Sequence, residues 1–139
     1  MLLLDTSALS AVMHRVPSAL ERLGQVDPWS VILCSPVAAE IHYGLANLVP
    51  DSKRRRLLAE EYRRIREIVR WADWSEQAAH TFGELKAGLR KRGTPIDDMD
   101  IAIASIALTL GATVATRNVR HFERIEDLRY ESWETPPSS

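Results

Sequence analysis

Acidic and amide side chains stand next to apolar segments at separate places in the chain. Asp5 follows the apolar run Leu2–Leu4, and Asp97, Asp98 and Asp100 precede a long apolar segment. Asn118 comes just after a third apolar segment. Several carboxylates without a histidine or cysteine cluster favour a hard cation such as Mg²⁺ or Mn²⁺. Such an ion can neutralise a phosphodiester and acidify an attacking water, so these residue types indicate phosphodiester hydrolysis.

A simpler interpretation is that these acids begin helices. A carboxylate in the first helical turn gains only about 0.3–1 kcal/mol from the helix dipole, and one acid is enough for that purpose. Three acids at one helix start repel one another unless a cation or basic group lies close. Asp5 also suits the start of a helix. From these residues alone, both interpretations stay open.

The apolar pattern predicts the elements that would hold these side chains. Continuous apolar runs of three to five residues are typical of buried parallel strands. The segments between them have helical spacing and start signals. We expect strands at Leu2–Leu4, Trp29–Leu33, Trp71–Trp74, Ala112–Thr116 and Leu128–Tyr130. We expect helices at Ala8–His14, Pro17–Leu23, from a Ser35 cap, from an Asp51 cap to Val69, from a Ser75 cap, and after Asp97. Gly111 is a natural residue to end the last of these helices.

This alternation predicts an α/β fold, a three-layer α/β/α sandwich around a central parallel sheet of four to five strands. Open parallel sheets bind ligands at the carboxyl ends of their strands, where Asp5 and Asn118 would lie. The helix from Ser35 carries Glu40 among apolar neighbours. A single glutamate on a helix is usually solvated, but the residues next to Glu40 in the sequence are Ala38, Ala39 and Ile41, all of them apolar.

The bulk composition narrows the class of protein. A chain of 139 residues with 45% hydrophobic and 27% charged residues is typical of one globular domain. We expect that domain to span residues 1–133 and residues 134–139 to form a disordered tail. The single cysteine, Cys34, rules out an internal disulfide and a multi-cysteine zinc site. No signal peptide or membrane-spanning run is visible, so we expect a cytoplasmic protein with no membrane partner.

Four segments together give the chain a family resemblance. They are Leu3–Ser7, Ser35–Gly44, Asp100–Ala104 and Gly111–Phe122, followed by Trp133 near the end. In this order and at these distances, they resemble the PIN-domain ribonucleases, and more closely the VapC-type toxins of bacterial toxin–antitoxin pairs. The resemblance covers residues 1 to about 133.

The resemblance implies a site and a set of partners. It makes Asp5, Glu40 and Asp100 the catalytic and metal-holding acids for Mg²⁺ or Mn²⁺, with Thr6, Thr116 and Asn118 as further pocket residues. Asp97 and Asp98 match no fixed acid of the family. We expect both to deepen the negative potential at the start of the helix, with Asp98 as a further pocket residue. Asn118 stands where many PIN domains have a fourth acid, which makes a second metal doubtful. The implied partners are an RNA substrate, tRNA or rRNA, and a VapB-type antitoxin. DNA would be bound by the antitoxin and not by this chain directly. The expected assembly is a homodimer, or a heterotetramer or larger complex with the antitoxin.

The arginines allow two interpretations. Net charge is −1, but 15 of the 18 basic residues are arginine, and many lie between residues 53 and 70. They can form a solvated helix face, paired with Glu60, Glu61 and Glu67. The apolar stripe of the same helix, which we expect to face the core, is Leu57, Leu58, Ile65, Ile68 and Val69. Alternatively some of them, with Arg117 and Arg120, follow an RNA backbone. His42 and His121 lie near the four segments, and we expect both to be structural or to face the substrate.

Three functions fit these observations to different degrees. The leading hypothesis is a metal-dependent endoribonuclease that acts as a toxin. A phosphoacceptor signalling domain also gathers acids around Mg²⁺, but it needs paired acids after the first strand and a late lysine, and no lysine follows Lys91. The third is a non-catalytic module that docks a partner and regulates transcription as part of a toxin–antitoxin complex. Asn118 in place of an acid keeps that alternative open.

Overall fold

A five-stranded parallel sheet forms the centre of the computed structural model, which describes residues 1–134. Its strands are β1 (Leu2–Leu4), β2 (Val31–Cys34), β3 (Arg70–Ala72), β4 (Thr113–Thr116) and β5 (Tyr130–Ser132). Their order across the sheet is β3-β2-β1-β4-β5. The predicted α/β fold is therefore confirmed. Of the tail predicted from residue 134 onward, residues 135–139 lie outside the described part of the chain.

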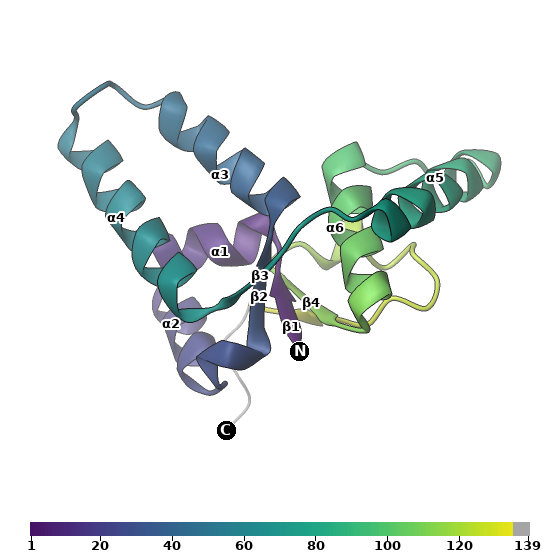
Figure 1. Cartoon of the computed structure of the whole chain (residues 1–139), viewed down its shortest axis with the longest axis horizontal. Helices are drawn as coiled ribbons and strands as arrows, with labels where there is room; N and C mark the ends of the chain where they lie inside the picture. The colour runs from purple at the N-terminus through teal and green to yellow at the C-terminus, as the bar shows by residue number, and fades with distance from the viewer. Residues whose placement is uncertain (135–139) are drawn as a thin grey trace.

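Six α-helices cover the two faces of this sheet. They are α1 (Thr6–Met13), α2 (Pro17–Gly24), α3 (Ser35–Ala46), α4 (Lys53–Ile68), α5 (Glu76–Lys91) and α6 (Asp98–Leu110). Figure 1 shows α1 to α4 on one side of the strands, and α5 and α6 on the other. The first two connections step outward from β1 to β2 and β3, and the third returns across the sheet to β4. Right-handed crossovers require this change of face, because the direction of stepping reverses.

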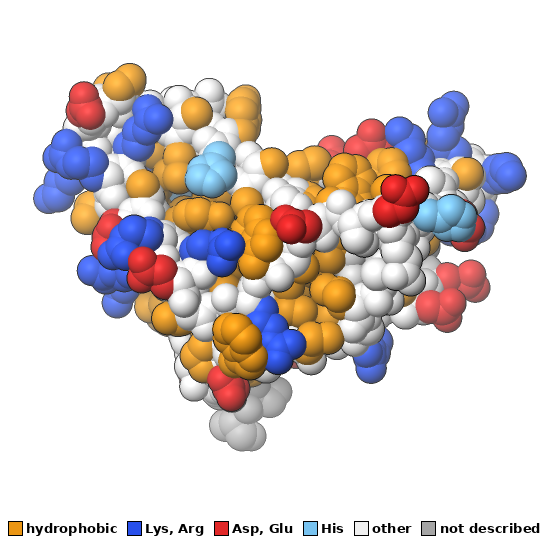
Figure 2. All heavy atoms as spheres, viewed as in Figure 1, with side chains coloured by type: hydrophobic (Ala, Val, Ile, Leu, Met, Phe, Trp, Pro, Cys, Tyr) orange, Lys and Arg blue, Asp and Glu red, His pale blue; other side chains and the backbone are white. Residues whose placement is uncertain are grey.

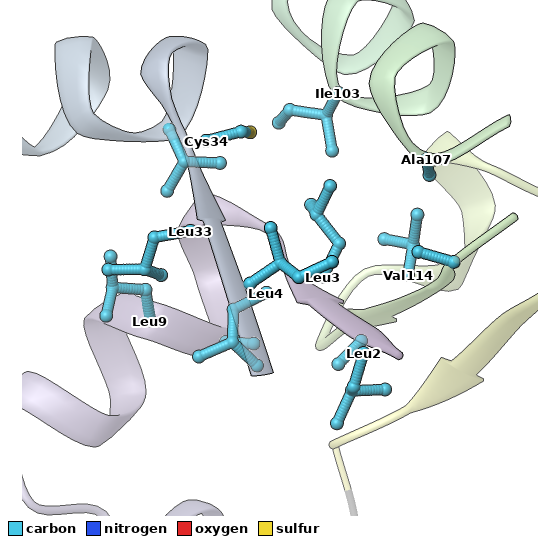
Figure 3. Packing of buried hydrophobic residues seen from close by; sticks show 14 of the residues in the cluster. Leu2, Leu3, Leu4, Leu9, Leu33, Cys34, Ile103, Ala107 and Val114 are labelled. Carbon is cyan, nitrogen blue, oxygen red and sulfur yellow. The ribbon is translucent and has the colours of Figure 1, made fainter. Parts of the chain in front are cut away.

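The hydrophobic core lies on both faces of the central strands. In Figure 3, Leu33 of β2 lies beside Leu9 of α1, whereas the neighbouring Cys34 points toward Ile103 of α6. Alternate residues of a strand point to opposite faces, so a strand buried on both faces must be apolar throughout. All residues of β1 and β2 are buried, which explains their continuous apolar runs.

The position of the site follows from the connections of β1 and β4. These strands are neighbours, with Leu4 paired to Ala115. The chain leaves β1 toward α1 on one face and reaches β4 from α6 on the other. Adjacent strands whose connections go to opposite faces leave a crevice at their carboxyl ends. Asp5 and Thr116 stand at that edge, directly after Leu4 and Ala115.

Three helix starts differ from the prediction. Asp5 caps α1, since its carboxylate accepts the backbone N–H of Ala8, and Thr6 and Ser7 lie inside the helix. Cys34 precedes α3, and the Ser35 hydroxyl accepts the N–H of Trp74 instead of capping. Ser52 caps α4, because Asp51 has a left-handed backbone with φ 60°.

Two further predictions fail at strand and helix surfaces. Residues 28–30 form a short 3₁₀ turn, so β2 starts two residues later than expected, and Trp29 is exposed. On α4, Leu57 and Ile68 were expected to face the core but are 56% and 52% exposed. Helix α4 projects along one side of the molecule, and Figure 2 shows basic side chains gathered there and over α5 at the opposite end. Within residues 1–134, no helix is long and apolar enough to cross a membrane.

Candidate active site

A cavity of about 620 Å³ opens at the carboxyl edge of β1 and β4. The predicted acids Asp5, Glu40 and Asp100 all line it. Its remaining lining residues are Thr6, Ser7, Ser10, Asp97, Asn118 and His121. These residues come from the starts of α1 and α6, the middle of α3 and the turn after β4. The fold therefore brings the four sequence segments to one place.

Asp5 is the most constrained acid of the cavity and is 3% exposed. Its Oδ1 accepts hydrogen bonds from the Ser7 hydroxyl at 2.7 Å and from the Ala8 N–H at 2.8 Å. Its Oδ2 accepts a hydrogen bond from the Thr116 hydroxyl at 2.5 Å. Three donors fix the plane of this carboxylate. Thr116, predicted as a pocket residue, is fully buried and supports Asp5 without lining the cavity itself.

Asp100 lies in the first turn of α6 and contacts the turn after β4. Its Oδ2 is 2.9 Å from His121 Nδ1, and His121 Nε2 is 2.8 Å from Asn118 Nδ2. Because the amide nitrogen of Asn118 can only donate, Nε2 of His121 accepts and its Nδ1–H donates to Asp100. The side chain of Asn118 thus orients His121, which in turn orients Asp100.

Glu40 reaches the cavity from the second turn of α3. Its Oε1 accepts a 2.5 Å hydrogen bond from the Thr6 hydroxyl, which links α3 to the start of α1. Among residues 1–134, no protein group bonds to Oε2. One oxygen of Glu40 is thus anchored, and the other is available to a water or ligand in the cavity.

The proximity of the acids changes their ionisation. Burial raises the pKa of Asp5 above its usual value, and the hydrogen bonds from Thr116, Ala8 and Ser7 oppose that rise. The pKa of Asp100 rises to about 6, mainly through burial. The negative charges of Asp97, Asp5 and Glu40 add to this rise, while His121 opposes it. Negative charge has therefore been concentrated in this cavity at a free-energy cost.

Asp97 and Asp98, both expected at the start of the last predicted helix, lie in different surroundings. Asp97 lines the cavity and caps α6 by accepting the N–H of Met99. The carboxylate of Asp98, predicted as a pocket residue, pairs with Lys86 of α5 instead and does not line the cavity. The helical period explains the difference, because residues three apart such as Asp97 and Asp100 share a face, whereas Asp98 is turned away.

The two arginines predicted to contact RNA lie in different surroundings. Arg117 lines a second cavity beside the first. Arg120 is exposed and lines neither of the two cavities.

The roles of two site residues were not predicted from the sequence. Ser7 bonds to Asp5, and His121 bonds to Asp100. The clue to His121 was its position three residues after Asn118, within one turn.

The cavity suits a hard divalent cation in the kind of donors that it offers. Carboxylate, hydroxyl and amide oxygens are the ligands of Mg²⁺ and Mn²⁺, and an added cation would relieve the raised pKa values. As the side chains stand, however, no three acidic, histidine or cysteine residues within 1–134 are grouped closely enough to hold an ion. Each of the three acids is bonded to a neighbouring protein donor instead. The donor set fits such an ion, and the side chains would have to turn to bind it.

Comparison with known proteins agrees with this arrangement. A family model described as the PIN domain matches residues 2–128, which is most of the chain. The chain belongs to the PIN domain family. The resemblance drawn from the four sequence segments is thereby confirmed.

Curated relatives of this PIN domain match it over nearly their full length. It is 33% identical to a "Ribonuclease VapC2" of Haemophilus influenzae, across 94% of this chain and 96% of that protein. It is 30% identical to a "tRNA(fMet)-specific endonuclease VapC" of Salmonella typhimurium, with the same coverage. Among solved structures, VapBC2 of Rickettsia felis bound to a promoter DNA fragment is similar, with TM-score 0.83 and 27% identity. That match covers 95% of this chain and 98% of the other.

Proposed function

We propose that this PIN domain is an endoribonuclease that depends on Mg²⁺ or Mn²⁺ and acts as the toxin of a toxin–antitoxin pair. One observation carries the proposal, namely that Asp5, Glu40 and Asp100 line a single cavity at the β1/β4 switch point. The relatives named as VapC ribonucleases, matched over nearly the whole chain, support it. We propose tRNA or rRNA as the substrate and the cytoplasm as the place of action.

The acids have different roles in the proposed reaction. Asp5 and Asp100 would hold the ion, with Glu40 as a further ligand. A bound Mg²⁺ or Mn²⁺ would supply positive charge at the scissile phosphate and lower the pKa of the attacking water. The free Oε2 of Glu40 is available to orient that water and to accept its proton. Ser7, Thr116 and His121 would hold the two aspartates in place through the hydrogen bonds described above.

The proposed inhibitor is an antitoxin of the VapB type, whose tail would occupy the acidic cavity with a basic side chain. The concentration of acids in the cavity supports this, since a guanidinium pairs well with several carboxylates. The antitoxin would supply any contact with DNA. A homodimer of this chain stays a prediction from the family resemblance.

Cleavage of a mixed tRNA and rRNA pool would test the proposed nuclease. We expect cutting that requires Mg²⁺ or Mn²⁺, stops in EDTA and disappears in Asp5→Asn. The folded state of the variant is checked by circular dichroism and thermal melting. Full activity of Asp5→Asn, or cutting that persists in EDTA, would contradict the assignment.

A non-catalytic docking module is the second candidate. It is favoured by the engagement of all three acids with protein donors and by the amide of Asn118 at the fourth position. Its signature is tight binding of a partner by folded, metal-loaded protein that cuts no RNA in the pool. Binding of Mn²⁺ can be measured by its paramagnetic effect on the nuclear magnetic resonance signals of Asp5 and Asp100. Broadening of these signals in inactive protein would indicate a metal site without activity, and unchanged signals would indicate that the cavity binds no metal.

A further inference from the structure

A second cavity, of about 420 Å³, adjoins the acidic one and is lined on one side by α1. Ser7 and Ser10 line both cavities. Ser7, Ser10 and His14 stand at intervals of three and four residues, so they form one stripe along α1. This stripe begins beside Asp5 and leads away from the acids. A chain that crosses the acidic cavity can therefore continue into the second one.

The far wall of this second cavity contains Arg117. Its backbone N–H donates to the Ser7 hydroxyl at 2.8 Å, and that hydroxyl in turn donates to Asp5. Two hydrogen bonds thus connect the main chain of Arg117 to the catalytic carboxylate. Substitution of the side chain would leave this link intact, because the bond comes from the backbone.

The guanidinium of Arg117 has no internal partner within the described residues 1–134. Its Nε is buried, and no hydrogen bond or ion pair reaches the side chain from any residue within 1–134. A buried donor without an acceptor costs roughly 1–3 kcal/mol, so this group is suited to a ligand that supplies one. Arginine presents parallel N–H donors that match the oxygens of a phosphate.

The other polar groups of the cavity suit the same kind of ligand. The Nδ1–H of His14 donates to the Ser10 carbonyl, which leaves its Nε2 open. The Ser10 side chain adds a hydroxyl donor. Glu134 lines the same cavity with a carboxylate, which opposes an anionic ligand there. The acidic cavity gathers four carboxylates, whereas this one has a single carboxylate, from Glu134, beside the Arg117 cation and neutral polar groups.

We propose that this second cavity binds the RNA phosphate next to the scissile one, with Arg117 as its main partner. The Ser10 hydroxyl makes a second contact, and the cavity fixes the direction in which RNA crosses the acidic site. This assignment rests on the proposed function, because it places the reacting phosphate at Asp5, Glu40 and Asp100.

The first test measures binding without cleavage, in EDTA, with a mixed-sequence RNA octamer followed by fluorescence anisotropy. Arg117→Gln should weaken binding about ten-fold and lower the slope of log Kd against log salt by about one. Arg120→Gln is the matched control, since that arginine is exposed and outside both cavities, and its slope should stay close to wild type. Glu134→Gln should tighten binding. Equal effects of the two arginine variants would overturn the proposal.

The second test locates the phosphate. An RNA oligonucleotide that spans a site cut in the pool receives one neutral methylphosphonate, on either side of the scissile bond. On one side only, it should raise KM about ten-fold for wild type and leave kcat nearly unchanged. The same change should add little in Arg117→Gln, because the charge partner is already gone. Independent, additive losses would overturn the assignment.

The two tests distinguish failure of the proposed phosphate site from failure of the proposed nuclease activity. RNA binding that depends on Arg117, without any cleavage, supports the phosphate site and contradicts the proposed activity. Metal-dependent cleavage that responds alike to Arg117→Gln and Arg120→Gln supports the activity and overturns the phosphate site. Protein that neither cuts nor binds RNA overturns both.

Discussion

Helices α4 and α6 have similar lengths, 16 and 13 residues, but very different surroundings. Only Ile65 of α4 is buried, whereas residues 101–107 of α6 are buried without interruption. Helix α4 is stabilised by its Ser52 cap and by pairs such as Arg63 with Glu60 and Glu67. Helix α6 packs among the sheet, α3 and α5.

This difference in burial indicates that α6 contributes to both the core and the site, whereas α4 contributes little to either. The helix that carries Asp100 is fixed by the core through residues 101–107, which directly follow Asp100, so the core sets the position of the carboxylate. Helix α4 carries most of its charge on an exposed face and contributes little to the core. We expect substitutions of the buried residues of α6 to lower stability and substitution of Asp100 to lower activity, and we expect those on α4 to affect neither strongly.

The largest expected effect concerns two acids at the start of α6. Asp100→Asn should reduce RNA cleavage by about a hundred-fold or more, because it removes a proposed ligand of the ion from the cavity. Asp98→Asn is the matched control, two residues away and paired with Lys86, and should stay within about two-fold of wild type. Initial rates under identical metal concentrations measure both. Equal losses would show that charge at the helix start matters, rather than the position of Asp100.

The next comparison sets a buried isoleucine against an exposed one. Ile103 of α6 is fully buried, and Ile103→Ala should lower the free energy of unfolding by about 2–5 kcal/mol. Ile68 of α4 is 52% exposed, so Ile68→Ala should change it by less than about 0.5 kcal/mol. Urea unfolding followed by circular dichroism measures both values. Similar losses in the two variants would mean that α4 is covered in solution.

The raised pKa of Asp100 gives a prediction for pH. Between the ordinary aspartate value and about 6, the folded state binds the proton more tightly than the unfolded state. The stability of the metal-free protein should therefore fall as pH rises from about 4 to 6. At pH 7, Asp100→Asn should be more stable than wild type by about 1–2 kcal/mol in EDTA.

Urea midpoints at several pH values check this trend, with Asp98→Asn as the control. The stability of Asp100→Asn should depend less on pH across the same window. Asp5, whose pKa is also raised, keeps part of the dependence in that variant. An unchanged dependence would remove Asp100 as its source.

The smallest expected effect is on the exposed ion pairs of α4. Arg63→Gln removes contacts with Glu60 and Glu67, both of which lie in solvent. Exposed pairs gain little, since water and salt screen them. The melting temperature should change too little to resolve at moderate salt. A clear fall in melting temperature would show that the ion pairs of α4 contribute more to stability than their exposure implies.

Sequence reasoning succeeded where one physical signal dominated. Strands buried on both faces must be apolar, so Leu2–Leu4 was predicted at its observed bounds. The Gly111 stop of α6 followed in the same way, since its left-handed φ of 66° favours glycine. At the site, the edge of the sheet and the family resemblance led to Asp5, Glu40 and Asp100, which the structure brings to one cavity.

The remaining details depend on contacts between distant segments. Asp98 and Asp97 have the same chemistry. The helical period turns Asp98 away from the cavity, and Lys86, which comes from the separate helix α5, pairs with it there. The contact of His121 with Asp100 requires the turn after β4 to fold back over α6. Leu57 and Ile68 fit an apolar stripe by spacing, but no element of the described chain covers them.

The hydrogen bond from Thr116 to Asp5 joins residues 111 positions apart. During synthesis β1 leaves the ribosome before its neighbour β4, and the supporting hydroxyl of Thr116 follows Asp5 by 111 positions. A chain translated only up to β4 therefore has Asp5 without the Thr116 hydrogen bond. The acidic cavity can assemble only after this later segment has been made, which would delay any harm to the cell's own RNA.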